Sequence, residues 1–156
     1  MTLENTVREK LSEWRPPTGR QELTITANGA SLTLTADRRE ELGCLLWDVT
    51  LQRTAPPKQT LRAWADHIAD KVTSLLEPLK VIEIDKQRNE GMLRSEQPLA
   101  RGDKVVYSEV LLKGTTRAIL RRYEAAANGT GQRQQIAFAL THEALAKLAG
   151  DLTAGR

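Results

Sequence analysis

The chain has 156 residues, 40% of them hydrophobic and 28% charged, which is typical of one folded soluble domain and not of a disordered protein. A single cysteine excludes an internal disulfide and a cysteine-cluster metal site, and no apolar run approaches the roughly 20 residues that span a bilayer. The net charge is +3, and residues 80–133 hold eleven Lys or Arg against seven Asp or Glu. Since the first residues also lack the apolar core of a signal peptide, we expect one cytoplasmic domain over residues 1–156, with no cofactor, no metal and no membrane contact.

The first third of the chain is predicted to form a helix and three strands. Apolar residues at helical spacing predict a helix over residues 3–14, and two prolines directly after it end the helix. Alternating residues on both sides of Asn28-Gly29 predict a β-hairpin, because this dipeptide adopts the positive φ angles of a tight turn. A third strand is predicted at 44–53. Its inner face should carry four residues: Leu45, Trp47, Val49 and Leu51.

The rest of the chain is predicted to contain two more helices and about five strands. A long apolar stripe predicts a helix at about 59–76 that packs across the first three strands. Strands are expected at 79–85, 92–96, 104–112, 116–124 and 134–140. Thr141 can cap a last helix over 142–153. The order α-βββ-α-βββββ-α, joined mainly by hairpins, predicts an α+β fold: a single antiparallel sheet of about seven to eight strands with the helices mainly on one face.

The sequence contains none of the common catalytic or cofactor signatures, such as a Gly-rich phosphate loop, a nucleophile elbow or a paired-histidine metal motif. Cys44 and His67 could form a nucleophilic pair, but no residue is placed to orient a base there. We therefore interpret Cys44 as a small hydrophobe, His67 as a residue at the edge of a helix stripe and His142 as a solvated or capping residue. The sequence thus favours a protein that is not an enzyme.

Two further groups of residues have an ordinary structural interpretation. Asp66 and Asp70 lie four residues apart on one helix face, where paired carboxylates could hold a metal. Arg62 and Lys71 stand beside them, which indicates a solvated charged surface instead. The three tryptophans lie on apolar stripes and are expected in the core: Trp14, Trp47 and Trp64.

The hairpin over residues 104–125 is the candidate interaction or ligand surface. With a two-residue turn, one face would carry Val106, Ser108, Val110, Leu112, Arg117, Ile119, Arg121 and Tyr123. The other face would carry Val105, Tyr107, Glu109, Leu111, Ala118, Leu120 and Arg122. Both faces then mix apolar and charged residues, and the helices cover only one of them. Either the stems of two arginines cover the remaining face, or a second copy of the chain, a partner segment or a ligand does. The candidate residues are Tyr107, Glu109, Arg117, Arg121, Arg122 and Tyr123.

Three functions remain open. The first is a non-enzymatic protein-interaction or chaperone-like module that dimerises or docks a partner through its sheet. The order of its elements resembles that of the dimeric type III secretion chaperones, although no residue motif is shared. The second is a small-molecule-binding protein or enzyme with a cavity between sheet and helices, where Tyr107, Glu109 and Arg122 would be the polar groups. The third is a weak nucleic-acid binder that uses the basic hairpin, where only two tyrosines could stack on bases.

Overall fold

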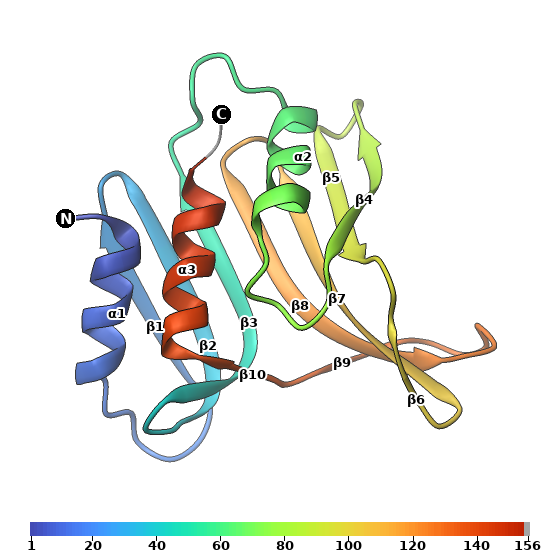
Figure 1. The fold of residues 1–156 in the computed structure, drawn as a ribbon, viewed down its shortest axis with the longest axis horizontal. Coiled ribbons are helices and arrows are strands. Elements are labelled where there is room, and N and C mark those ends of the chain that lie inside the picture. Colours follow the sequence, from blue (N-terminus) through green and yellow to red (C-terminus); the bar gives the residue numbers. More distant parts are fainter. Residues whose placement is uncertain (155–156) are drawn as a thin grey trace.

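A computed structural model describes residues 1–154, in which three helices lie on one face of a single antiparallel sheet (Figure 1). The helices are α1 (Leu3–Glu13), α2 (Leu61–Lys71) and α3 (His142–Thr153). The strands are β1 (Gln21–Ala27), β2 (Ala30–Arg39), β3 (Gly43–Arg53), β4 (Leu79–Asp85), β5 (Glu90–Ser95), β6 (Leu99–Arg101), β7 (Lys104–Lys113), β8 (Arg117–Ala126), β9 (Gln134–Ile136) and β10 (Phe138–Thr141). The predicted α+β fold is confirmed. The sheet has ten strands instead of seven to eight, because β6 forms in a predicted loop and the last predicted strand is divided at Ala137.

The sheet opens between its two central strands. Its main order is β1-β2-β3-β8-β7-β5-β4, but β3 and β8 are paired only from Val49 to Gln52 on β3. Beyond these four pairs the two strands separate, and β10 pairs with the first residues of β3 while β9 pairs with the later residues of β8. Residues 134–141 therefore run along one end of the sheet, from β8 across to β3 (Figure 1).

The helices divide the sheet between them. Helices α1 and α3 pack against each other and cover β1 to β3, whereas α2 packs on β4 and β5. The prediction that the second helix crosses the first three strands is wrong, because α3 occupies that place. That helix is also shorter than predicted, since β-branched and polar residues follow Lys71 and favour helix poorly: Val72, Thr73 and Ser74. No helix in the described residues is long and apolar enough to cross a membrane.

Local signals are reproduced closely in the structure. Asn28 and Gly29 have φ angles of 52° and 73°, and they join β1 to β2 in the predicted two-residue turn. The hydroxyl of Thr141 accepts a hydrogen bond of 3.0 Å from the backbone N–H of Ala144, so the predicted cap of α3 is confirmed. Strand β4 covers residues 79–85, the bounds that the sequence predicts.

A β-bulge changes the inner face of β3. The register between β2 and β3 shifts near Ala36, so that Ala36 pairs with Leu46 instead of Trp47. Before the bulge, Cys44 and Leu46 point into the core and are buried, and Leu45 and Trp47 are only half-buried. The predicted inner face of β3 is therefore wrong at Leu45 and Trp47. It is right at Val49 and Leu51, which are both buried.

The central hairpin has a different register from the predicted one. Three residues, 114–116, connect β7 to β8, so Val110 faces Leu120 and Glu109 faces Arg121. The face toward the helices carries Val106, Ser108, Val110, Leu112, Ala118, Leu120 and Arg122. The helix-free face carries Val105, Tyr107, Glu109, Leu111, Arg117, Ile119, Arg121 and Tyr123. The extra turn residue moves every side chain of one strand to the other face, so the predicted faces are wrong.

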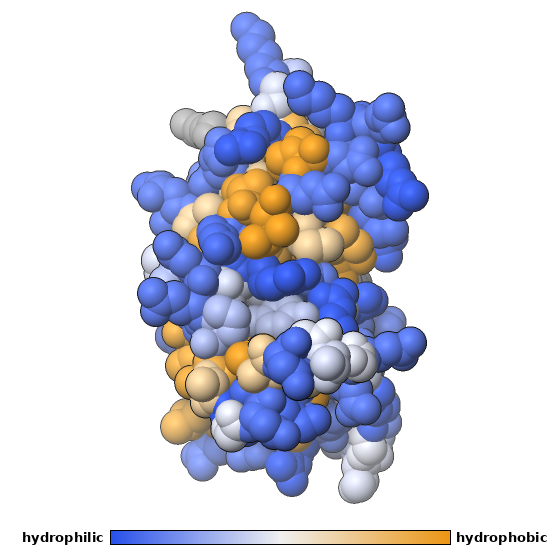
Figure 2. Space-filling view, turned by 90° about the vertical axis from the view of Figure 1, so that its right-hand side faces the viewer, coloured by the Kyte–Doolittle hydropathy of each residue, from blue (hydrophilic) through white to orange (hydrophobic). Residues whose placement is uncertain are grey.

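Strand β4 forms one outer edge of the sheet. Figure 2 looks onto this side of the molecule and shows hydrophobic residues exposed among hydrophilic ones. Ile82, which lies at an irregularity of the β4–β5 ladder, is 43% exposed. Lys80, Glu83 and Asp85 put charges along the same strand, which protects an edge from pairing with other chains.

Candidate functional site: the helix-free face of the sheet

An arginine–tyrosine patch lies on the helix-free face, and we define it by six residues: Arg94, Tyr107, Glu109, Arg121, Tyr123 and Arg133. Glu109 is at its centre and is only 5% exposed, although no helix covers it. Its Oε2 accepts hydrogen bonds from Arg94 Nη2 at 2.9 Å and from Arg133 Nη1 at 2.6 Å. The hydrogen bonding of Arg133 to Glu109 raises the pKa of Arg133 above its ordinary value. The patch is thus held together by one carboxylate that two guanidinium groups share.

The two tyrosines of the patch form a cross-strand pair. Tyr107 on β7 faces Tyr123 on β8, with ring centroids 6.0 Å apart. The guanidinium carbon of Arg133 lies 3.7 Å from the Tyr123 ring centroid, and that of Arg94 lies 4.9 Å from the Tyr107 centroid. Each ring therefore has a cation above it, an arrangement worth about 0.5–1 kcal/mol at an exposed site.

The patch has more positive than negative charge. Arg121 faces Glu109 across the ladder, but its nearest carboxylate oxygen belongs to Asp48, 3.9 Å from Nε. Three patch arginines thus share two carboxylates. Arg117 lies on the same face near the turn and is exposed, with no carboxylate within 4.0 Å in the described residues.

Arg122, the remaining candidate residue, lies on the face of the sheet that the helices cover. It is buried beneath the α2–β4 connection, where its Nη1 and Nη2 donate to Glu77 at 2.9 and 3.1 Å. Nη1 also donates to the hydroxyl of Ser108 at 2.8 Å. Because Tyr107 and Glu109 are on the helix-free face, the predicted site of Tyr107, Glu109 and Arg122 in one cavity is wrong.

A hollow of about 280 Å³ does lie on the helix side of the sheet, where the sheet opens. We call it the first hollow. Its walls come from the α2–β4 connection, β6 and the β9–β10 segment: Leu75, Leu76, Leu99, Arg101, and residues 136–140. Ser108 and Arg122 line it as well, together with Leu45 and Val106. Most of its lining residues are apolar, and Arg122, the partner of Glu77, forms part of its wall.

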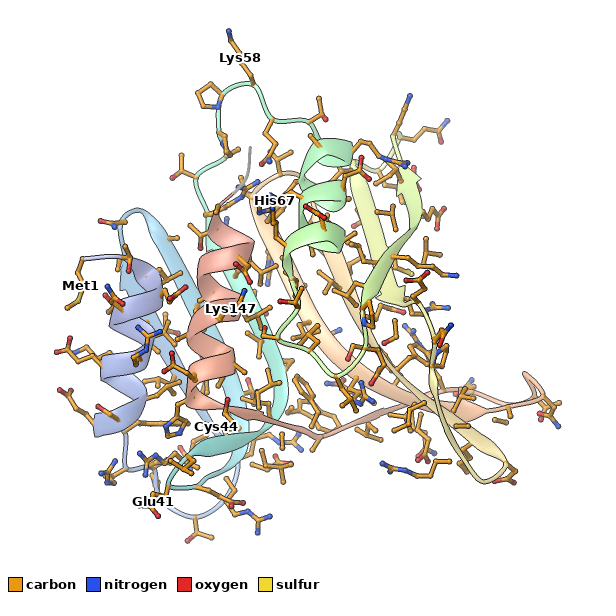
Figure 3. All side chains as sticks on the ribbon, in the orientation of Figure 1. Met1, Glu41, Cys44, Lys58, His67 and Lys147 are labelled. Atoms are coloured by element: carbon orange, nitrogen blue, oxygen red, sulfur yellow. The ribbon has the colours of Figure 1, made fainter. Side chains whose placement is uncertain are left out.

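Cys44 and His67 do not form a pair. Figure 3 shows them toward opposite ends of the molecule. The ring Nε2 of His67 lies 3.1 Å from the backbone carbonyl oxygen of Asp151, which fits a residue at the border of α2. Burial raises the pKa of the Cys44 thiol from its ordinary value of 9.0 to about 11. This thiol is therefore a poor nucleophile.

We expect the Cys44 thiol to react slowly in the folded protein. At pH 8 a pKa near 11 instead of 9.0 lowers the thiolate fraction about 100-fold, and burial lowers access further. Alkylation by iodoacetamide should therefore be at least about 100-fold slower in buffer than in guanidinium chloride. A native rate within tenfold of the unfolded rate would show that the thiol is accessible and ionised.

The charged residues on α2 are solvated. Arg62 Nε lies 3.2 Å from Asp66, Lys71 Nζ lies 3.4 Å from Asp70, and all four side chains are more than half exposed. His142 is half-buried at the start of α3, and burial lowers its pKa. Its Nε2 has no hydrogen-bond partner among the described residues.

Three charged residues, two in the arginine–tyrosine patch and one that pairs with Arg122, were not predicted from the sequence. Arg94 faces Glu109 across the β5–β7 ladder, so a correct strand register would have found it. Glu77 and Arg133 lie in connections, and no periodic pattern places them. Their roles follow from tertiary structure alone.

The fold and the patch define a structural class: an α+β protein whose single antiparallel sheet is covered by helices on one face and carries the arginine–tyrosine patch on the other. Comparisons with protein families, with curated proteins and with solved structures found no match. The resemblance in element order to type III secretion chaperones therefore has no support from a related structure.

Proposed function

We propose that this protein is a non-enzymatic interaction module that docks an acidic protein partner on its arginine–tyrosine patch. The observation that carries the proposal is the sharing of buried Glu109 by Arg94 and Arg133. This arrangement fixes two guanidinium groups before any partner arrives, so little side-chain entropy is lost on binding. Arginine and tyrosine are also the residue types that most often dominate the energy of protein interfaces.

The charge of the patch favours an acidic partner over a second copy of the chain. A two-fold dimer through this face would place the same surplus of arginines on both sides of the interface. Such like-charge contact costs free energy, whereas aspartate and glutamate side chains of a partner would compensate Arg121 and Arg117.

The tyrosine rings argue against nucleic acid as the partner. Bases bind single-strand proteins by stacking on open aromatic faces. Arg133 covers the Tyr123 ring at 3.7 Å, and Tyr107 is only 7% exposed beneath its own arginine. A base would have to displace a guanidinium that is already bound to Glu109.

Binding of a fluorescein-labelled polyglutamate of about 20 residues at low salt tests the proposal. Arg133→Ala should weaken binding about fivefold, because it removes a fixed cation from the patch. Arg62→Ala, which removes an equal charge from the solvated side of α2, should change binding less than twofold. Equal losses in both variants, or no binding to the wild type, would contradict the proposal.

Two oligonucleotides of equal charge, one of thymidines and one without bases, separate the nucleic-acid alternative. We expect them to bind equally, since no ring face is open for stacking. Tighter binding of the thymidine strand that is lost in Tyr123→Ala would favour nucleic acid as the partner.

A further inference from the structure

We propose a second docking surface: the free edge of β10, which adds an extended segment of a partner polypeptide as a new strand. Within the described residues, β10 pairs only with β3. The N–H of His142 donates to the carbonyl oxygen of Leu42 at 2.9 Å, which continues this ladder past the end of the strand. Because residues of an antiparallel ladder alternate in direction, the backbone groups of Ala139 point away from β3. Ala139 is exposed, and its N–H and carbonyl make no backbone hydrogen bond outside the strand ladders in the described residues.

The edge lacks the features that usually protect a free strand. The segment Gln134–Thr141 reads QQIAFALT and contains no charged residue and no proline. Strand β4, at the outer edge of the sheet, carries charges and an irregularity in its ladder. An uncharged free edge is therefore available for strand addition, in which main-chain hydrogen bonds supply affinity.

Hollows on both sides of Ala139 can take side chains of the added strand. The first hollow lies toward β9, and a second hollow of about 410 Å³ lies toward the β2–β3 turn. Both are lined by Leu45, Ala139 and Leu140. Exposed large hydrophobic residues gather here: of the five in the described chain, Leu76 and Leu99 line the first hollow and Leu42 lines the second. Alternate apolar side chains of a strand fit such paired hollows.

The charges at the two ends give the added strand a direction. Glu40 and Glu41 line the second hollow, and Figure 3 places Glu41 at this end of the molecule near Cys44. Arg101 lines the first hollow and has no carboxylate within 4.0 Å in the described residues. Since β10 runs from the first hollow to the second, an antiparallel strand would begin with a basic residue and end with an acidic one.

A slender strand fits this edge better than a second copy of the chain. In Figure 1 the β2–β3 turn and the hairpin of β6 both extend below the line of β9 and β10. The backbone of the edge thus lies between two segments that extend beyond it. In a dimer through this edge, the same segments of both molecules would come together and oppose pairing of the two strands. The partner is therefore an extended segment with a basic start, alternating apolar residues and an acidic end.

Anisotropy of a labelled nonapeptide tests this proposal. The probe has lysine first, aspartate last and alternating valine and threonine between them. Ala139→Pro removes the outward N–H, a change that edge strands tolerate, and should weaken binding about tenfold. The matched control is Thr26→Pro on the outer strand β1. The hydrogen bonds of the β1–β2 ladder alternate from the Asn28-Gly29 turn, so the N–H of Thr26 also points away from the sheet. This variant should change binding less than twofold.

A second pair of variants does not depend on tolerance of proline. Leu76→Ser at the first hollow should weaken binding about fivefold, whereas Ile82→Ser on β4 should leave it unchanged. A peptide with lysine and aspartate exchanged should bind about threefold more weakly, since each rim pair contributes little. Arg133→Ala should not affect this peptide, so failure here and failure of the patch proposal can be distinguished.

The proposal is wrong if the wild type does not bind the peptide, or if Ala139→Pro and Leu76→Ser both bind it as the wild type does. It is also wrong if light scattering shows a wild-type dimer that Ala139→Pro dissociates, because the edge would then be an interface between copies.

Discussion

Replacing Glu77 by alanine should lower the free energy of unfolding by about 3–5 kcal/mol, the usual cost of leaving one buried charge unpaired. Arg122 is 7% exposed and donates to both oxygens of Glu77. The hydroxyl of Ser95 also donates to Glu77, at 2.8 Å. The substitution therefore leaves a guanidinium and a hydroxyl without their acceptor beneath the α2–β4 connection. Urea unfolding followed by circular dichroism measures the loss.

Two variants show whether the loss comes from the unpaired charge. Asp66→Ala breaks an exposed pair with Arg62 and should cost less than about 1 kcal/mol. The double variant Glu77→Met, Arg122→Met removes both charges and should recover at least half of the loss, because apolar replacement of a buried pair is often neutral. If Glu77→Ala unfolds within 1 kcal/mol of the wild type, water reaches Arg122 and the pair is not buried as described.

Trp64→Ala should be the most destabilising change in the core, at about 3–5 kcal/mol. Trp64 is fully buried on α2, and its indole N–H donates to the carbonyl oxygen of Leu152 at 3.1 Å. The guanidinium carbon of Arg53, itself 4% exposed, lies 3.9 Å from its ring centroid. The variant therefore creates a cavity, leaves a buried carbonyl without a donor and removes the ring beneath a buried cation.

The same substitution at Trp47 is the natural control. Trp47 lies at the β-bulge, is half-buried and is covered by Arg20, 4.1 Å from its ring centroid. Trp47→Ala should cost about 1–2 kcal/mol by thermal or urea unfolding. Equal losses for the two variants would contradict the assignment of Trp64 to the core and Trp47 to its border.

The sequence alone predicted correctly those features that depend only on residues close together in the chain. The Asn28-Gly29 turn, the Thr141 cap and the bounds of β4 are each set within a few residues, and all three are confirmed. The α+β class follows from the order of such elements. Local signals thus predicted most of the elements and the class of the fold.

The remaining features depend on strand register and on packing between elements, which the pattern of apolar and polar residues does not determine. One extra residue in the turn after Lys113 moves the side chains of one strand to the opposite face of the sheet. One bulge near Ala36 places Leu46 in the core, where the sequence predicted Trp47. The position of α2 depends on where the last helix packs. The patch was found only in part, because Arg133 reaches Glu109 from a connection without periodicity.

The separation of β3 from β8 has a consequence for how the chain assembles. Strands β4 to β9 and α2 form a continuous stretch of sequence, whereas β1 to β3 are completed by β10 and α3, which follow that stretch. The middle of the chain can therefore pair its strands within itself, whereas the core under β1 to β3 is closed only when Leu145 and Leu148 of α3 pack against it. The four residue pairs between β3 and β8 join these two parts of the sheet.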